Sequence, residues 1–289
     1  MVLRIEDLDH PKVKPGASAQ AVEDLRWLGL DWDEGPDKGG PHSPYVQTER
    51  KKMYAEALEK LIAEKLVYPC VCARSGIEAV QSAPHSGENG LYYGGNCRGR
   101  FGSYDEAAAF RGDGTPPVWR FMTPPGETVF TDMIAGVSRA DVSRETGDFA
   151  LARDPGGAGY MLAVVVDDAA MGVTQVVRGD DLLPATHRQI HLQRALGLPV
   201  PEYAHVPLVV AGDGRRLAKR HGDTRISAFR SAGFTPEEIT GLLAYWCGLA
   251  DKGAHVHPCE LIKDFSFEKL SRDRSVYTPD SLLPFADRK

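Results

Sequence analysis

Apolar residues near the amino terminus recur at the spacing of one helical face in two stretches. Val22, Leu25 and Leu28 share a face, and Gly29 after them ends the first predicted helix. A second helix is predicted near residues 49–66. Its apolar face consists of Tyr54, Leu58, Leu61 and Ile62. The first part of the chain therefore contains amphipathic helices that cover a core.

Three other segments are mostly apolar and contain many β-branched residues. They are Val2–Ile5, Leu162–Val166 and Val173–Val177. Continuous apolar runs are typical of strands that are covered on both faces, so we predict buried strands here. A helix is predicted from Leu182 to Leu196, with Gly197 as its end. Strands and helices that alternate in this way predict an α/β fold.

The chain divides into four parts that differ in amino-acid composition and in the pattern of predicted elements. Residues 1–68 and 149–210 have the α/β pattern, whereas Gly, Pro and Cys are frequent in 69–148, which is expected to be an insertion. Within it, Val118–Phe121 is a predicted strand. The last part, 211–289, is expected to be mostly helical. In "FTPEEI" Thr235 is a helix N-cap, and Glu238 completes a capping box with it.

Composition limits the class of protein without selecting one. The 289 residues carry a net charge of −6 and five cysteines, and no apolar run approaches the length that crosses a bilayer. Few cysteines, odd in number, favour a reducing cytoplasmic location over a disulfide framework. The net charge gives no global preference for nucleic acid, although a local basic surface is compatible with it.

The densest positive charge lies in "GDGRRLAKRHGD". It contains Arg215, Arg216, Lys219, Arg220 and His221 between two glycines. Such a loop suits a triphosphate or pyrophosphate whose negative charge grows during a reaction. A solvated basic loop is the alternative, and it is the commoner role of a charge run.

Acidic residues follow two of the predicted strands. Glu6 and Asp7 come after the first, and Asp167 and Asp168 come after the second. Carboxylates at the carboxyl edge of a sheet bind ammonium groups, ribose or Mg²⁺, or they cap the strand ends.

Arg178 follows the third predicted strand and precedes a helix, at the same expected edge. An arginine there can hold a substrate carboxylate in a bidentate pair. The alternative is a structural arginine that Asp180 or Asp181 neutralises.

Three cysteines of the insertion are candidate metal ligands. Cys70, Cys72 and Cys97 suit a structural zinc, which prefers four ligands in a tetrahedron. Tyr93 and His85 are the nearest candidates for the fourth position, and three unlinked thiols are the alternative. His187 and His191 are one helical turn apart; we interpret them as a helix surface, because no third ligand accompanies them.

Taken in chain order, several segments resemble the catalytic region of glutamyl-tRNA synthetases, a family of class I aminoacyl-tRNA synthetases. The segments include "LRIEDLD", "LGLDWDEGP", "PYVQTERKKMYAEALEKL", "VVRGDDLL", "YAHVPLV" and "RLAKRHGD". The resemblance implies a Rossmann-like catalytic core with a zinc-bearing insertion and a helical carboxyl-terminal segment.

The resemblance also implies residue roles. Glu6, Tyr160 and Arg178 would bind the substrate glutamate. Lys219 would be the catalytic lysine of the family's KMSKS loop and would bind ATP together with Arg216 and Arg220; ATP would enter as a substrate with Mg²⁺. Ala218 stands where the family usually has Ser, which removes one hydroxyl donor.

Within the family the chain most resembles the short branch that attaches glutamate to queuosine at the wobble position of tRNA(Asp). Members of that branch activate glutamate alone, whereas ordinary glutamyl-tRNA synthetases need tRNA. In this branch the pattern of Cys70, Cys72, Tyr93 and Cys97 holds zinc. The alternatives are a catalytic fragment of an ordinary glutamyl-tRNA synthetase and a non-catalytic, zinc-stabilised tRNA-binding module.

One part of the family pattern has no counterpart in this sequence. Family members place a strand, an Arg-bearing loop and a HIGH-type helix before the segment that matches "LRIED". The expectation is weak or absent activation of glutamate by this polypeptide. A start codon assigned too far downstream, a trimmed chain and a natural truncation would each produce this pattern.

Overall fold

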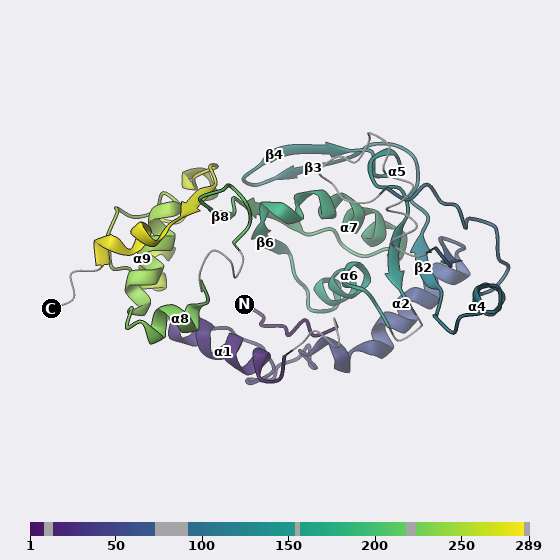
Figure 1. Cartoon of the computed structure of the whole chain (residues 1–289), viewed down its shortest axis with the longest axis horizontal. Helices are drawn as coiled ribbons and strands as arrows, with labels where there is room; N and C mark the ends of the chain where they lie inside the picture. Colours follow the sequence, from purple (N-terminus) through teal and green to yellow (C-terminus); the bar gives the residue numbers. More distant parts are fainter. Residues whose placement is uncertain (9–13, 73–91, 154–156, 218–223, 286–289) are drawn as a thin grey trace.

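The computed structural model describes residues 1–8, 14–72, 92–153, 157–217 and 224–285. Its long axis runs from a carboxyl-terminal end, with α8 and α9, to an opposite end with β2 and α4, as Figure 1 shows. Helices α6 and α7 lie between these ends. Among the described residues, none of the helices combines the length and apolar character that crossing a bilayer requires.

The α-helices of the described residues are α1 (Ala17–Trp27), α2 (Lys51–Ala63), α4 (Tyr104–Arg111), α5 (Val142–Glu145), α6 (Tyr160–Ala170), α7 (Leu183–Leu196), α8 (Ile226–Ser231), α9 (Pro236–Trp246) and α10 (Pro258–Ile262). Short 3₁₀ segments are η1 (Gln47–Glu49), η2 (Asp180–Leu182), η4 (Phe267–Lys269) and η5 (Pro279–Phe285). The strands are β1 (Val67–Cys70), β2 (Val118–Phe121), β3 (Thr128–Asp132), β4 (Gly136–Ala140), β5 (Phe149–Ala152), β6 (Gln175–Gly179), β7 (Glu202–Val206), β8 (Val209–Ala211) and β9 (Ser275–Tyr277).

These strands form three sheets. The four-stranded sheet has the order β4-β3-β7-β6, with β6, β7 and β3 parallel and β4 antiparallel to β3. The β3–β4 hairpin extends over α7 (Figure 1). A second sheet, β1-β2-β5, is antiparallel, and β8 pairs with β9 in parallel near the carboxyl terminus. The architecture is α/β, as the sequence predicts.

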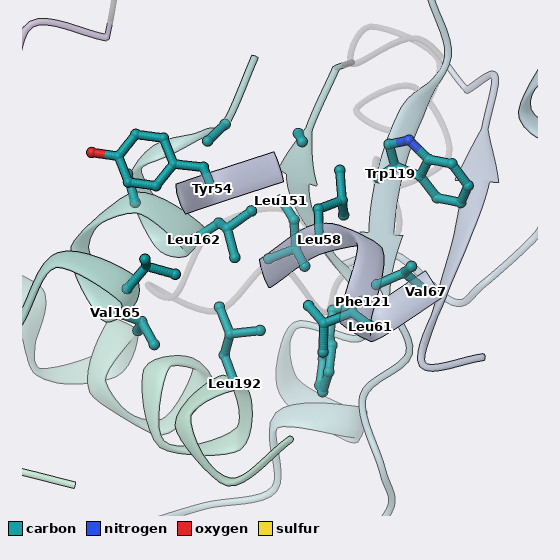
Figure 2. Packing of buried hydrophobic residues seen from close by; sticks show 14 of the residues in the cluster. Tyr54, Leu58, Leu61, Val67, Trp119, Phe121, Leu151, Leu162, Val165 and Leu192 are labelled. Carbon is teal, nitrogen blue, oxygen red and sulfur yellow. The ribbon is translucent and has the colours of Figure 1, made fainter. Parts of the chain in front are cut away.

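The main core forms where α2, α6 and α7 meet the β1-β2-β5 sheet. Figure 2 shows Leu58 and Leu61 of α2 facing Leu162 of α6, Leu192 of α7 and Phe121 of β2. All five side chains are at most 2% exposed. Each fully buried side chain of this size contributes roughly 1.5–3 kcal/mol relative to exposure, so this junction fixes α6 and α7 against the sheet.

Several predicted elements are confirmed. Strand β2 covers the predicted residues Val118–Phe121, and α7 ends at Gly197, which has a φ of 69° that favours glycine. The capping box of α9 is present, because Thr235 accepts a hydrogen bond from the amide of Glu238 and the Glu238 side chain accepts one in return.

The predicted strand Leu162–Val166 is wrong, because these residues belong to helix α6. The run of six residues from Leu162 to Asp167 is buried on every side, between α2, α7 and β5. A helix enclosed in this way loses its amphipathic pattern, so its apolar run is indistinguishable from that of a buried strand. Asp167 and Asp168 are consequently helical residues and do not lie at a strand edge.

The predicted strand at Val2–Ile5 is present only as isolated pairing. Val2 forms a parallel bridge with Glu34, and Ile5 forms one with Val46. Both side chains are partly exposed. The segment is therefore extended but is not a central strand of a sheet among the described residues.

A buried carboxylate connects the first part of the chain to α6. Asp167 is 0% exposed and accepts hydrogen bonds from Arg50 Nε at 2.6 Å, Tyr54 Oη at 2.8 Å and Gln47 Nε2 at 2.9 Å. Arg50 also donates to the carbonyl oxygens of His42 and Pro44. Arg50 is itself only 3% exposed, so its charge depends on this one carboxylate for compensation.

Replacing Asp167 with Ala should lower the free energy of unfolding by about 3–5 kcal/mol, because Arg50 would remain buried without a counter-charge. Urea unfolding followed by circular dichroism measures the change. Asp251→Ala, at an exposed position, is the matched control and should change stability by less than about 0.5 kcal/mol. Equal effects of the two substitutions would contradict the importance of the buried pair.

Candidate functional site

Arg178 lies near the end of β6, where three polar side chains fix its guanidinium group. Its Nε donates to Nε2 of His205 at 3.1 Å. Its Nη2 donates to Thr186 Oγ1 and to Gln189 Oε1, both at 2.7 Å. The guanidinium carbon lies 5.3 Å from the centre of the Tyr203 ring. Arg178 is therefore held by neutral groups on one edge and by an aromatic face.

The other edge of Arg178 is available for a ligand. Within the described residues its Nη1 has no hydrogen-bond partner and the guanidinium has no ion pair. Asp181 pairs with Arg216 and Asp180 pairs with Arg274, both at 3.0 Å, so neither acid neutralises Arg178. The structural alternative for Arg178 is thus not supported. Because Nε and Nη2 are occupied, a carboxylate would approach Nη1.

His205 and Asp132 form a buried pair behind Arg178 that the sequence analysis missed. Nδ1 of His205 lies 2.6 Å from Oδ2 of Asp132, and both side chains are 0% exposed. Burial lowers the pKa of His205, although its hydrogen bond with Asp132 acts in the opposite direction. The imidazole is therefore neutral near pH 7, with its proton on Nδ1 and Nε2 free to accept. No short motif marks this pair, because its members are far apart in sequence.

Two residues of α6, Tyr160 and Asp168, act electrostatically on Tyr203, whose ring lies beside the guanidinium of Arg178. Burial raises the pKa of Tyr203, and Arg178, Asp168 and Tyr160 all act electrostatically on the same hydroxyl. Tyr160 is the first residue of α6 and is 40% exposed.

Glu6 reaches this neighbourhood through Arg4. Nη2 of Arg4 donates to Oε1 of Glu6 at 2.9 Å, and Nη1 donates to Asp168 Oδ1 at 2.8 Å. The side chain of Glu6 remains 39% exposed. Arg4 is a second residue that the sequence analysis did not single out, and it links Glu6 to α6.

The predicted phosphate-binding loop is described only in part. Arg216 is 77% exposed on its side chain and pairs with Asp181 at 3.0 Å. Asp181 follows β6, so Arg216 is attached next to the Arg178 region. Ala218, Lys219 and Arg220 lie outside the described residues, as does His85.

Three cysteines and one tyrosine of the insertion converge in a compact cluster. The sulfur atoms of Cys70, Cys72 and Cys97 all lie within 4.8 Å of one another. Tyr93 Oη is 3.1 Å from the Cys70 sulfur and 3.4 Å from the Cys72 sulfur. Ligands at about 2.3 Å from a tetrahedral zinc are separated by roughly 3.8 Å, so the residues fit such an ion.

Hydrogen bonds and a cation–π contact surround this cluster. Arg98, one residue after Cys97, donates from Nε to Asp148 Oδ2 at 2.6 Å, and Tyr68 Oη donates to the same oxygen at 2.5 Å. The guanidinium of Arg120 lies 4.0 Å from the centre of the Tyr93 ring. These contacts fix the chain next to Cys97 and the ring of Tyr93.

The interpretation of His187 and His191 as a helix surface is wrong. His187 is 3% exposed, and its Nε2 lies 2.9 Å from Ser138 Oγ. His191 Nε2 lies 2.7 Å from Thr128 Oγ1. These histidines attach the β3–β4 hairpin to α7, which explains why polar residues occupy a buried helix face.

Comparison with known proteins identifies the class of this fold and site. The family model for the catalytic domain of class I tRNA synthetases (E and Q) matches residues 1–282, and the chain belongs to this family. The structure of a glutamate tRNA ligase from Elizabethkingia meningosepticum, in complex with its amino acid, superposes with a TM-score of 0.79 at 26% identity. That match covers 97% of this chain and 61% of the other.

Two groups of relatives within the family differ in how similar they are to this chain. A glutamyl-Q tRNA(Asp) synthetase from Symbiobacterium thermophilum is 50% identical over 94% of this chain and 84% of its own length. Its counterpart from Nitratidesulfovibrio vulgaris is 46% identical over 98% and 86%. A glutamate–tRNA ligase from Sulfurihydrogenibium is 36% identical, and the match spans 57% of that relative. The chain is thus similar to a family of ligases.

The buried histidines predict a pH dependence of stability. Burial lowers the pKa values of His187, His191 and His205 below their ordinary value of 6.5 in the folded chain. The unfolded state therefore takes up protons first, and the free energy of unfolding falls as the pH drops below about 6.5. Urea unfolding at about pH 7.5 and at about pH 5.5 measures this, with His187→Gln expected to flatten the profile. Equal stability at both pH values would contradict neutral buried histidines.

Proposed function

We propose that this chain activates glutamate with ATP and transfers it to queuosine at the wobble position of tRNA(Asp). The observation that carries the proposal is the environment of Arg178, whose Nη1 has no hydrogen-bond partner and whose guanidinium contacts no acid within the described residues. The similarity to proteins named glutamyl-Q tRNA(Asp) synthetases supports the choice of substrates.

A second polar atom beside Arg178 supports an anionic or carbonyl-bearing ligand. Gln189 is 2% exposed, and its Nε2 has no partner among the described residues, although its Oε1 accepts from Arg178. An unsatisfied buried donor costs about 1–3 kcal/mol. A substrate carboxylate beside Arg178 would offer an acceptor to both residues, while Glu6 has the opposite charge to the substrate ammonium group.

The proposed reaction has two steps. In the first, a carboxylate oxygen of glutamate attacks the α-phosphorus of ATP, and pyrophosphate leaves with Mg²⁺. Lys219, with Arg216 and Arg220, would stabilise the negative charge that develops on the leaving group. In the second, a hydroxyl of queuosine attacks the acyl carbon and AMP leaves. Arg178 and Tyr160 would hold the glutamyl group through both steps.

Glutamylation of tRNA(Glu) is the alternative within the same family. The relatives named glutamyl-Q tRNA(Asp) synthetases are 44–50% identical to this chain, whereas those named glutamate–tRNA ligases are 35–38% identical. The identities favour the queuosine reaction.

We also propose that Cys70, Cys72, Tyr93 and Cys97 hold a structural zinc ion. Their mutual distances suit a tetrahedral ion, and three of the four are at most 4% exposed. Such an ion would link β1 to the loop that carries Tyr93 and Cys97, where the described residues offer only a small apolar cluster.

Replacing Arg178 with Ala should weaken glutamate binding by at least about 30-fold, because charged hydrogen bonds of about 1.5–3 kcal/mol each would be lost. Isothermal titration calorimetry with glutamate measures the affinity. Arg139→Ala is the control, since Arg139 is 59% exposed and pairs with Glu127 on the hairpin. Unchanged glutamate affinity in the Arg178 variant would remove this residue from the pocket.

The zinc proposal predicts about one zinc ion per purified chain. Cys97→Ser should lose the ion and lower the midpoint of thermal unfolding, because a tetrahedral site needs all four ligands. Elemental mass spectrometry and calorimetry measure the two effects. Cys259→Ser, at an exposed cysteine, should change neither. Zinc-free wild-type protein after growth and purification with added zinc would contradict the proposal.

A further inference from the structure

Three adjacent strands align a line of polar side chains behind the proposed glutamate site. The parallel register places Arg178 of β6 opposite His205 of β7, and Asp132 of β3 opposite Tyr203 of β7. His205 lies two residues beyond Tyr203 on β7, and the side chain of Asp132 reaches it, with Oδ2 at 2.6 Å from Nδ1 of His205. The line starts in the interior, where Asp132 and His205 are buried, and ends at Arg178, which is partly exposed.

Asp132 is held in one orientation by the backbone. Its Oδ1 accepts from the amides of Ile134 at 3.0 Å, Ala135 at 2.8 Å and His205 at 3.1 Å. This leaves Oδ2 for Nδ1 of His205 at 2.6 Å. These hydrogen bonds lower the pKa of Asp132, although burial by itself would raise it, so the group is a carboxylate and acts only as an acceptor.

An acceptor at Oδ2 determines the tautomer of the imidazole. The proton of neutral His205 must lie on Nδ1, so Nε2 carries a lone pair, and Nε of Arg178 donates to it at 3.1 Å. With the opposite tautomer, an N–H of His205 would face an N–H of Arg178. The carboxylate of Asp132 thus controls a contact on Arg178 although it does not touch that residue.

We propose that Asp132 and His205 are positioning residues that hold the Arg178 guanidinium with its Nη1 edge toward the substrate carboxylate. The inference rests on the proposed function for the identity of that carboxylate. His205 fixes Nε, while Thr186 and Gln189 fix Nη2, so the only unassigned edge of the group within the described residues is Nη1. A pre-oriented arginine binds its ligand without first losing side-chain freedom.

Asp132→Asn tests the control of the tautomer with little change in shape. The amide oxygen can still accept the backbone hydrogen bonds at Oδ1, whereas the amide nitrogen now donates to Nδ1 of His205. The proton moves to Nε2, where it opposes Arg178. We expect glutamate affinity to fall by about tenfold in calorimetry, with ATP affinity unchanged.

Nitrogen-15 NMR of labelled protein detects the tautomer of His205 directly and does not depend on an activity assay. We expect the wild-type His205 ring to be protonated on Nδ1 and the Asp132→Asn ring on Nε2. A purely structural role of the pair would lower stability in the variant but would not move the proton.

Two substitutions of His205 test whether Arg178 needs a hydrogen-bond acceptor at this position or only a side chain of similar size. His205→Gln offers a carbonyl oxygen near the place of Nε2, and His205→Leu offers none. Both leave Oδ2 of Asp132 without its partner, so their stabilities should fall together. We expect glutamate affinity within about threefold of wild type for Gln and about tenfold weaker for Leu. His191→Gln, a change on α7 at a hydrogen bond to Thr128, is the control and should leave affinity unchanged.

The outcomes distinguish this inference from the proposed function. If wild-type protein does not bind glutamate, the proposed function fails, and the NMR result still decides whether Asp132 sets the tautomer of His205. If wild type binds and Asp132→Asn binds equally well, or if the proton stays on Nδ1 in that variant, the positioning role is overturned. Equal affinities of the Gln and Leu variants would also overturn it.

Discussion

The buried carboxylate of Asp167 is the interaction on which the arrangement of the site depends. It accepts hydrogen bonds from Arg50, Gln47 and Tyr54. These donors lie just before α2 and in its first turn. The next residue, Asp168, holds Arg4 and through it Glu6. Through Arg50 and Arg4, two adjacent residues of α6 therefore fix the amino-terminal segment against this helix. A helix surrounded by apolar side chains tolerates this charge only because every partner is present.

The other half of the site is a sheet edge where an arginine is held by neutral groups. A partly buried cation often has an acidic partner, but Arg178 contacts an imidazole, a hydroxyl, an amide and an aromatic ring among the described residues. No acidic side chain of the described residues therefore neutralises its positive charge. The nearby acids have partners of their own, since Asp180 and Asp181 bind Arg274 and Arg216. Among the described residues, this distribution leaves the charge of Arg178 available for an anionic ligand.

The sequence was sufficient for the α/β class, for β2, α2, α7 and the cap of α9, because each has a local signal. It was insufficient for α6, because burial on all sides removes the periodicity that separates a helix from a strand. It also could not find Asp132, which is 73 positions from His205 and joins it only through the parallel pairing of β3 and β7. The cysteine cluster had a local signal in its spacing, whereas the surrounding Arg98, Tyr68 and Asp148 contacts did not. Lys219 and Arg220 remain predictions from resemblance.

Glutamate-dependent exchange of pyrophosphate into ATP, measured on this chain without tRNA, tests the central claim most directly. We predict exchange that requires glutamate, is not supported by glutamine or aspartate, and needs no tRNA. Exchange that appears only when tRNA(Glu) is added would indicate an ordinary glutamate–tRNA ligase. No exchange at saturating glutamate and ATP, with or without tRNA, would contradict the claim that this chain activates glutamate.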